Sequence, residues 1–98
     1  MSEEEKQFVK HDENKVRFEL VEPNFVEGVA KVLTLGSEKY DDDNWKKCDD
    51  ISRYKGALLR HLYAYLSGET VDPESGLSHL YHLSTNAMFL DFFDRFET

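Results

Sequence analysis

The sequence has 98 residues, with 20 acidic side chains against 12 Lys and Arg, which gives a formal charge of −8. A chain of this length forms one domain, and its 40% hydrophobic content is typical of a folded protein rather than a disordered one. The acidic balance argues against non-specific nucleic-acid binding, which needs a basic surface. Apolar runs of only a few residues predict no membrane-spanning helix.

The single cysteine, Cys48, excludes a disulfide framework within the chain and indicates a reducing compartment. The first residues, MSEEEKQF, are acidic and lack the apolar stretch of a secretory signal. We therefore expect a cytoplasmic protein.

The N-terminal region divides into two parts. Residues 1–14 are acidic with little to bury, so we expect a flexible arm ahead of a single helical domain at residues 15–98. Val16, Phe18 and Leu20 alternate with charged residues, which predicts a short extended segment. One strand cannot form a sheet alone, so this segment is expected to lie along helices or to pair with a second subunit.

Apolar spacing predicts a first helix over residues 24–40, with Asn24 as its N-cap and Glu27 completing a capping box. Residues 41–50 show no helical period and are predicted to form a loop. A second helix is expected over residues 51–67, with Asp50 as a cap and Gly68 as the stop.

The third predicted helix opens at Asp72-Pro73, an N-cap followed by proline at the first helical position, and runs to about Phe96. The fold class is therefore all-α, a bundle of about three main helices, completed by oligomerisation.

Polar residues fall where this bundle should be apolar. On the third helix His79, His82 and Asn86 lie within an arc of about 60°, and apolar residues occupy both sides of the helix. Buried polar groups need partners, so the row is either a structural hydrogen-bond network or a functional site, and two histidines with an asparagine favour function.

Two further polar residues point inward on the other helices. His61 lies at the inward edge of the second helix, whereas Arg60 points away. Lys39 falls among apolar residues of the first helix, where it either covers apolar surface with its stem or binds phosphate.

The junction between the last two helices, residues 68–76, concentrates Glu69, Asp72 and Glu74. Closely spaced carboxylates are the oxygen ligands that Mg²⁺ prefers, although helix capping and solvation explain them as well. In the preceding loop Trp45, beside Asn44, either plugs the end of the bundle or stacks on a ligand base.

Four segments carry a resemblance to a known family: KHDENKVRFELVEP (10–23), VLTLGSEKYDDDNW (32–45), SRYKGALLRHL (52–62) and GETVDPESGLSHLYHLSTNAMFL (68–90). They resemble the short phage-encoded dATP/dGTP diphosphohydrolases, usually placed with the MazG-like all-α nucleoside triphosphate pyrophosphohydrolases. The resemblance implies hydrolysis of a purine deoxynucleoside triphosphate to monophosphate and pyrophosphate, in the cytoplasm of a phage-infected or bacterial cell. It also implies a homodimer or homotetramer that uses Mg²⁺ (or Mn²⁺).

The sequence departs from the usual MazG-like pattern. It has no E-E-x-x-E in the first or second predicted helix, and its E-x-x-D near the core runs from Glu69 to Asp72 at a helix junction. His79 and His82 stand where an acidic pair is expected.

We hypothesise that a carboxylate–histidine group holds one or two divalent ions and positions water for attack on the α-phosphorus. The residues expected to act in catalysis are Glu69, Asp72, His79 and His61, and those expected to hold metal are Glu69, Asp72, Glu74 and His79. The expected substrate contacts are Lys39, Arg53 and Arg60 to phosphate, His82 and Asn86 to water or sugar, and Asn44 and Trp45 to the base. The alternatives are a non-catalytic nucleotide- or protein-binding module and a purely structural helical oligomer.

Overall fold

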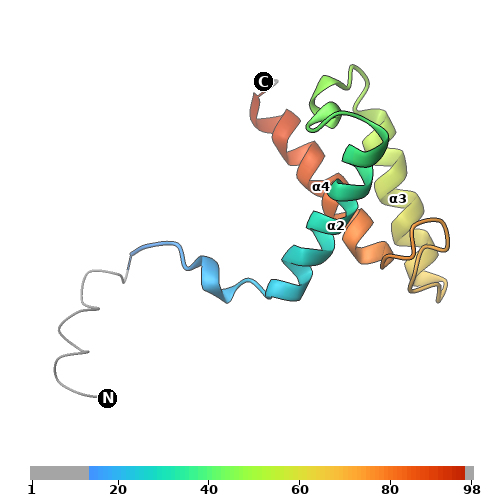
Figure 1. Ribbon diagram of the computed structural model, residues 1–98, viewed down its shortest axis with the longest axis horizontal. Coiled ribbons are helices and arrows are strands. Elements are labelled where there is room, and N and C mark those ends of the chain that lie inside the picture. Colours follow the sequence, from blue (N-terminus) through green and yellow to red (C-terminus); the bar gives the residue numbers. More distant parts are fainter. Residues whose placement is uncertain (1–13, 97–98) are drawn as a thin grey trace, which may run out of the picture.

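The computed structural model describes residues 14–96. Within that range the fold is three α-helices with short 3₁₀ turns, and a single isolated bridge takes the place of any strand (Figure 1). The all-α, three-helix prediction is therefore confirmed. The elements in chain order are η1 (Phe18–Leu20), α2 (Pro23–Lys39), η2 (Asn44–Lys47), α3 (Ser52–Leu66) and α4 (His79–Phe96).

Helix α2 starts from a cap one residue ahead of its proline. The Glu22 carboxylate accepts hydrogen bonds from the backbone N–H groups of Asn24 (3.2 Å) and Phe25 (2.9 Å), and Pro23 takes the first helical position. The predicted cap at Asn24 was wrong because the carboxylate of Glu22 already satisfies these exposed donors.

Helix α3 has the bounds expected from its apolar spacing, within one residue. Asp50 Oδ1 accepts from the backbone N–H (3.1 Å) and the hydroxyl (2.6 Å) of Ser52, which fixes the entry into the helix. Beyond the last turn Gly68 adopts φ +103°, a left-handed conformation that ends the helix.

Helix α4 begins at His79, not at the Asp72-Pro73 pair predicted to open it. Residues 72–78 instead form a closed turn. The backbone N–H of Asp72 donates to the carbonyl of Leu77 (2.9 Å), and the N–H of Gly76 donates to the carbonyl of Asp72 (2.8 Å). Gly76 has φ +74°, which breaks any helix at that point. The turn carries Asp72 back towards the first turns of α4.

The segment ahead of α2 is not the extended strand that its alternation suggested. Phe18–Leu20 forms the 3₁₀ turn η1, and Val16 and Phe18 are 77% and 81% exposed. Residues 14–22 run away from the three helices (Figure 1). The predicted acidic arm lies outside the described residues except for Asn14.

Helix α4 packs against both α2 and α3 (Figure 1). The contact with α2 includes Gly28, which lies against the ring of Tyr81. Near the start of α3 an aromatic cluster fills the space between α3 and α4, and the ring centroids of Tyr54 and Phe89 lie 4.8 Å apart. Among the described large apolar side chains only Phe93 is buried, so the core is thin. None of the described helices is long and apolar enough to cross a bilayer.

Candidate functional site

Three of the predicted site residues form a hydrogen-bonded chain at the junction of α3 and α4. The Nδ1 atoms of His61 and His79 lie 2.9 Å apart, and His79 Nε2 lies 2.7 Å from Glu69 Oε1. His61 comes from the last half of α3, Glu69 follows the left-handed Gly68, and His79 is the first residue of α4. His79 is only 4% exposed, so Glu69 and His61 satisfy a buried imidazole.

The hydrogen bonds of this chain define one arrangement of ring protons for a neutral His79. Glu69 is acceptor-only when ionised, so His79 donates from Nε2. With His79 neutral, its Nδ1 holds a lone pair and accepts the Nδ1–H of His61. His61 is then left with a lone pair on Nε2. Burial, followed by the nearby His82 ring, lowers the pKa of His61 and favours this neutral form, while the Asp72 carboxylate opposes the shift.

His82 lies against the other side of His61. The two rings stack nearly parallel, with centroids 4.5 Å apart and 7° between planes. His82 Nε2 lies 2.7 Å from the Ser75 hydroxyl oxygen and 3.6 Å from Asp72 Oδ2. Burial lowers the pKa of His82, and Asp72 partly offsets that effect. Ser75, which the sequence analysis overlooked, thus joins the turn to the helix.

One group of metal-capable side chains emerges within the described residues: His61, Asp72 and His82. Each offers one donor atom, and these atoms lie within 4.8 Å of one another. Of the four expected metal ligands, only Asp72 belongs to this group, and His61 and His82 take the other places. His79 and Glu69 are instead linked to His61 through hydrogen bonds. It opens onto a pocket of about 410 Å³.

The wall of this pocket opposite the histidines comes from α2. Lys39, whose two interpretations were left open, lines it together with the apolar side chains of Val32 and Leu35. Glu74 and Ser75 complete the rim from the turn. The pocket therefore places one cation and two carboxylates around the imidazole pair.

The remaining predicted residues lie elsewhere. Asn86 is buried and donates from Nδ2 to the carbonyl of His82 (2.8 Å), a bond within α4. It lines neither this pocket nor the second pocket described below. Arg53 and Arg60 are exposed and also line neither pocket. Of the three cations expected at phosphate, Lys39 alone lines this pocket, whereas the charge of Arg60 contributes to lowering the pKa of His61 from outside it.

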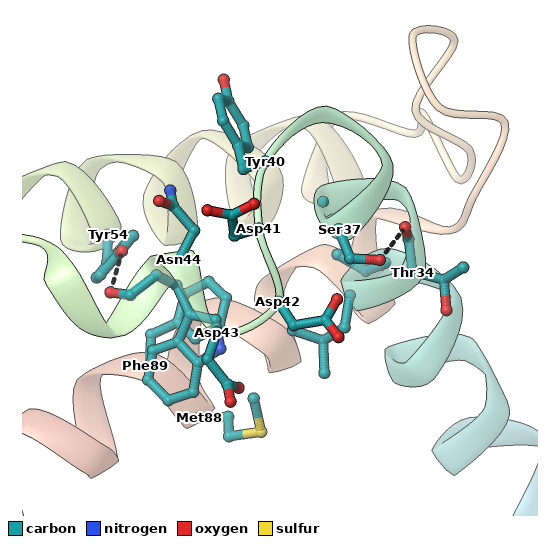
Figure 2. Close-up of a pocket in the computed structure, with 14 residues that line it drawn as sticks. Thr34, Ser37, Tyr40, Asp41, Asp42, Asp43, Asn44, Tyr54, Met88 and Phe89 are labelled. Carbon is teal, nitrogen blue, oxygen red and sulfur yellow. Dashed lines mark hydrogen bonds between the residues drawn. The ribbon is translucent and has the colours of Figure 1, made fainter.

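A second pocket, of about 670 Å³, adjoins the first and shares with it Val32, Gly36 and Tyr40. Figure 2 shows the carboxylates at residues 41–43 along the loop that crosses it, with Phe89 and Met88 of α4 beneath. Asn44 and Trp45 both line it.

Trp45 is held in place by the aromatic cluster. Its ring stacks on Phe89 with centroids 4.5 Å apart and 21° between planes, and its carbonyl accepts from the Tyr54 hydroxyl at 2.7 Å. Burial raises the pKa of Tyr54 to about 12. One face of the indole is therefore occupied by packing, as expected of a plug, while the residue also borders the larger pocket.

Fold and site together define an all-α domain in which a histidine–carboxylate group faces a lysine-bearing pocket. A family model described as "dATP/dGTP diphosphohydrolase, N-terminal" matches residues 5–97, and the chain belongs to this family. It is 35% identical over 82 residues to a dATP/dGTP diphosphohydrolase of Salmonella phage PMBT28. That match covers 84% of this chain and 28% of the phage protein, so the chain spans little more than a quarter of the relative's length. No solved structure matches the chain.

Proposed function

We propose that this chain is the nucleotide-binding and hydrolytic part of a diphosphohydrolase that cleaves dATP or dGTP to the monophosphate and pyrophosphate. Family membership and the name of the phage relative support the substrate class. The observation that carries the proposal is structural. His61, Asp72 and His82, from two helices and the turn between them, converge on one pocket that also contains Lys39.

The pocket residues divide the work of binding a triphosphate. Lys39 neutralises phosphate oxygens from the α2 wall, where its ammonium group is exposed to a ligand. Phosphate charge is further neutralised by a divalent cation when one is bound by the histidine–carboxylate group. Arg53 and Arg60 have no part in this arrangement within one chain.

Glu74 is the pocket carboxylate that lies outside the donor group, and we assign the attacking water to it. The carboxylate accepts a proton as the water oxygen bonds to the α-phosphorus. The bond from that phosphorus to the bridging oxygen breaks, and pyrophosphate leaves with the bonding electrons. The Asp72 carboxylate holds this segment in position by accepting the Glu74 backbone N–H at 3.0 Å.

The larger pocket suits the base of the same nucleotide. It shares a wall with the smaller pocket that contains Lys39, so a nucleotide whose phosphates lie in the smaller pocket can extend its base into the larger one. The side chains of Trp45, Met88 and Phe89 give the larger pocket an apolar floor. The carboxylates at residues 41–43 repel phosphate, which favours this direction of binding, and together with Asn44 they offer acceptors to purine amino groups.

Assembly into a homodimer or homotetramer is part of the proposal. The thin core supports it, because several large apolar side chains remain exposed in the single chain, including Leu20 (69%) and Leu66 (68%). Light scattering coupled to gel filtration measures the subunit number directly.

The test is hydrolysis by the purified chain, with each deoxynucleoside triphosphate and each of Mg²⁺ and Mn²⁺. Monophosphate and pyrophosphate should appear from dATP or dGTP, and Glu74→Gln should lose turnover while it retains nucleotide binding. Asp49→Asn removes the same charge from an exposed loop residue outside both pockets and serves as the control.

A binding module without catalysis is the second candidate. The missing E-E-x-x-E pattern favours it. Nucleotide binding without turnover in the same assay would establish that function instead, and the absence of both would leave a structural role.

A further inference from the structure

The donor atoms around the pocket are unusual for the cation that the family resemblance implies. Mg²⁺ is bound through oxygen ligands and keeps several waters, whereas this group offers two imidazole nitrogens and one carboxylate. Imidazole ligands suit Zn²⁺, Cu²⁺, Fe²⁺ and Ni²⁺ far better, and two histidines with one carboxylate leave further coordination positions open. We propose that His61, Asp72 and His82 form a first-row transition-metal site that discriminates against Mg²⁺.

The tautomer of His61 fits this role. Metal-bound histidines donate their other ring N–H to a carboxylate, carbonyl or water, which orients the ring and raises its basicity. His61 Nδ1 is occupied by His79, and His79 Nε2 is in turn bound to Glu69, so a carboxylate stands at the end of the chain. Nε2 of His61 is the nitrogen that remains for a ligand. Glu69 and His79 are therefore positioning residues in this site.

The donors already lie near one another without an ion. Metal–ligand bonds of about 2.1 Å place neighbouring donors roughly 3–4 Å apart. The three donor atoms already lie within 4.8 Å of one another, and the side chains of Asp72 and His82 are only 16% and 15% exposed. Because the lone pair of an imidazole nitrogen lies in the ring plane, the two stacked rings must rotate out of parallel to direct both nitrogens at one ion. Access for the ion, and for phosphate or water beside it, comes from the adjoining pocket.

This inference rests on the proposed function, which assigns the pocket to nucleotide binding. Its test uses the full chain without nucleotide. Co²⁺ is titrated into the protein and its visible absorption is recorded, since nitrogen ligation changes the intensity and position of these bands. One equivalent of Co²⁺ should bind, Zn²⁺ should displace it, and a large excess of Mg²⁺ should not. Displacement of Co²⁺ by Mg²⁺, or spectra like those of the aqueous ion, would overturn the site.

Variants assign the ligands. His82→Gln and Asp72→Asn should each lower Co²⁺ affinity by more than about tenfold, and Asp49→Asn should leave it unchanged. Circular dichroism confirms that each variant is folded. Glu74→Gln tests whether the ion is bound by carboxylates alone instead of by the histidine–carboxylate group. If Glu74→Gln lost Co²⁺ binding and His82→Gln retained it, the assignment would be overturned.

The two proposals fail separately. Hydrolysis supported by Mg²⁺ without stoichiometric Co²⁺ binding would remove the transition-metal site and leave the proposed function intact. Stoichiometric Co²⁺ or Zn²⁺ binding without any hydrolysis would remove the proposed function and leave the site.

Discussion

The contact between Gly28 of α2 and Tyr81 of α4 gives the sharpest test of the fold, because it depends on the absence of a side chain at residue 28. A Cβ added at Gly28 would lie 2.5 Å from Cε1 and Cζ of Tyr81, more than about 1 Å inside the optimal carbon–carbon separation. The Tyr81 ring is itself packed edge-on against Phe25, with centroids 5.6 Å apart, so it cannot move freely. Overpacking of this kind costs about 1–3 kcal/mol, and the gain in helix propensity from alanine returns roughly 0.5–1 kcal/mol.

Gly36, two turns further along the same helix, is the matched control. A Cβ there meets nothing within 4 Å, so Gly36→Ala keeps the propensity gain without the clash. In urea denaturation followed by circular dichroism, the midpoint of Gly28→Ala should lie below that of the parent chain, and the midpoint of Gly36→Ala should lie above it. With a slope of about 1–3 kcal/mol per molar urea, their midpoints should differ by about 1 M. Equal midpoints would refute the contact and with it the placement of the α2 wall that carries Lys39.

The remaining predictions concern charge. Without added metal, the lowered pKa values of His61 and His82 stabilise the fold above pH 6.5, and this stabilisation is lost as the pH falls through their folded-state pKa values. Urea midpoints that stay constant from neutral pH to about pH 5 would contradict this prediction. At the alkaline end, the raised pKa of Tyr54 stabilises the fold below pH 10, and that contribution is lost between pH 10 and about 12; tyrosinate absorbance should show one fewer late-titrating group in Tyr54→Phe. Lys39→Gln should raise KM for the triphosphate more than it lowers kcat. A larger effect on kcat than on KM would exclude Lys39 from binding of the substrate in its ground state. Glu69→Gln should weaken Co²⁺ binding by about 10–100-fold through His61, and unchanged affinity would show that the chain does not orient the ring.

Local sequence signals predicted the bodies of the helices well and their starts less well. The apolar spacing of α2 and α3 follows from a 3.6-residue period, which needs no knowledge of the rest of the chain. The Asp72-Pro73 pair is different, since the same dipeptide opens a helix or a turn with equal ease. The bridge between Val71 and Ser78 and the left-handed Gly76 decide in favour of the turn, and both depend on how the chain closes on itself.

The site shows the same limit. Helix faces alone were enough to expect His61 and His79 on the inside, and the structure brings them into hydrogen-bond contact. They were not enough to pair His82 with Asp72, or to find Ser75, because those contacts come from a turn that helical geometry does not describe. The junction at residues 68–76 was singled out for its carboxylates and lies in a segment that carries the family resemblance, and the hydroxyl of Ser75 within it was the signal available for that residue.

The misplaced helix start is what makes the site possible. Had α4 begun at Asp72, the ten helical steps from Asp72 to His82 would separate them by about 15 Å along the axis, at 1.5 Å per residue. The turn instead brings Asp72 Oδ2 to 3.6 Å from His82 Nε2. A carboxylate within reach of two stacked imidazoles therefore requires that the chain not be helical between residues 72 and 78. The same turn places Glu74 and Ser75 on the pocket rim, so any change that extends α4 towards Pro73 would remove the carboxylates from the histidines.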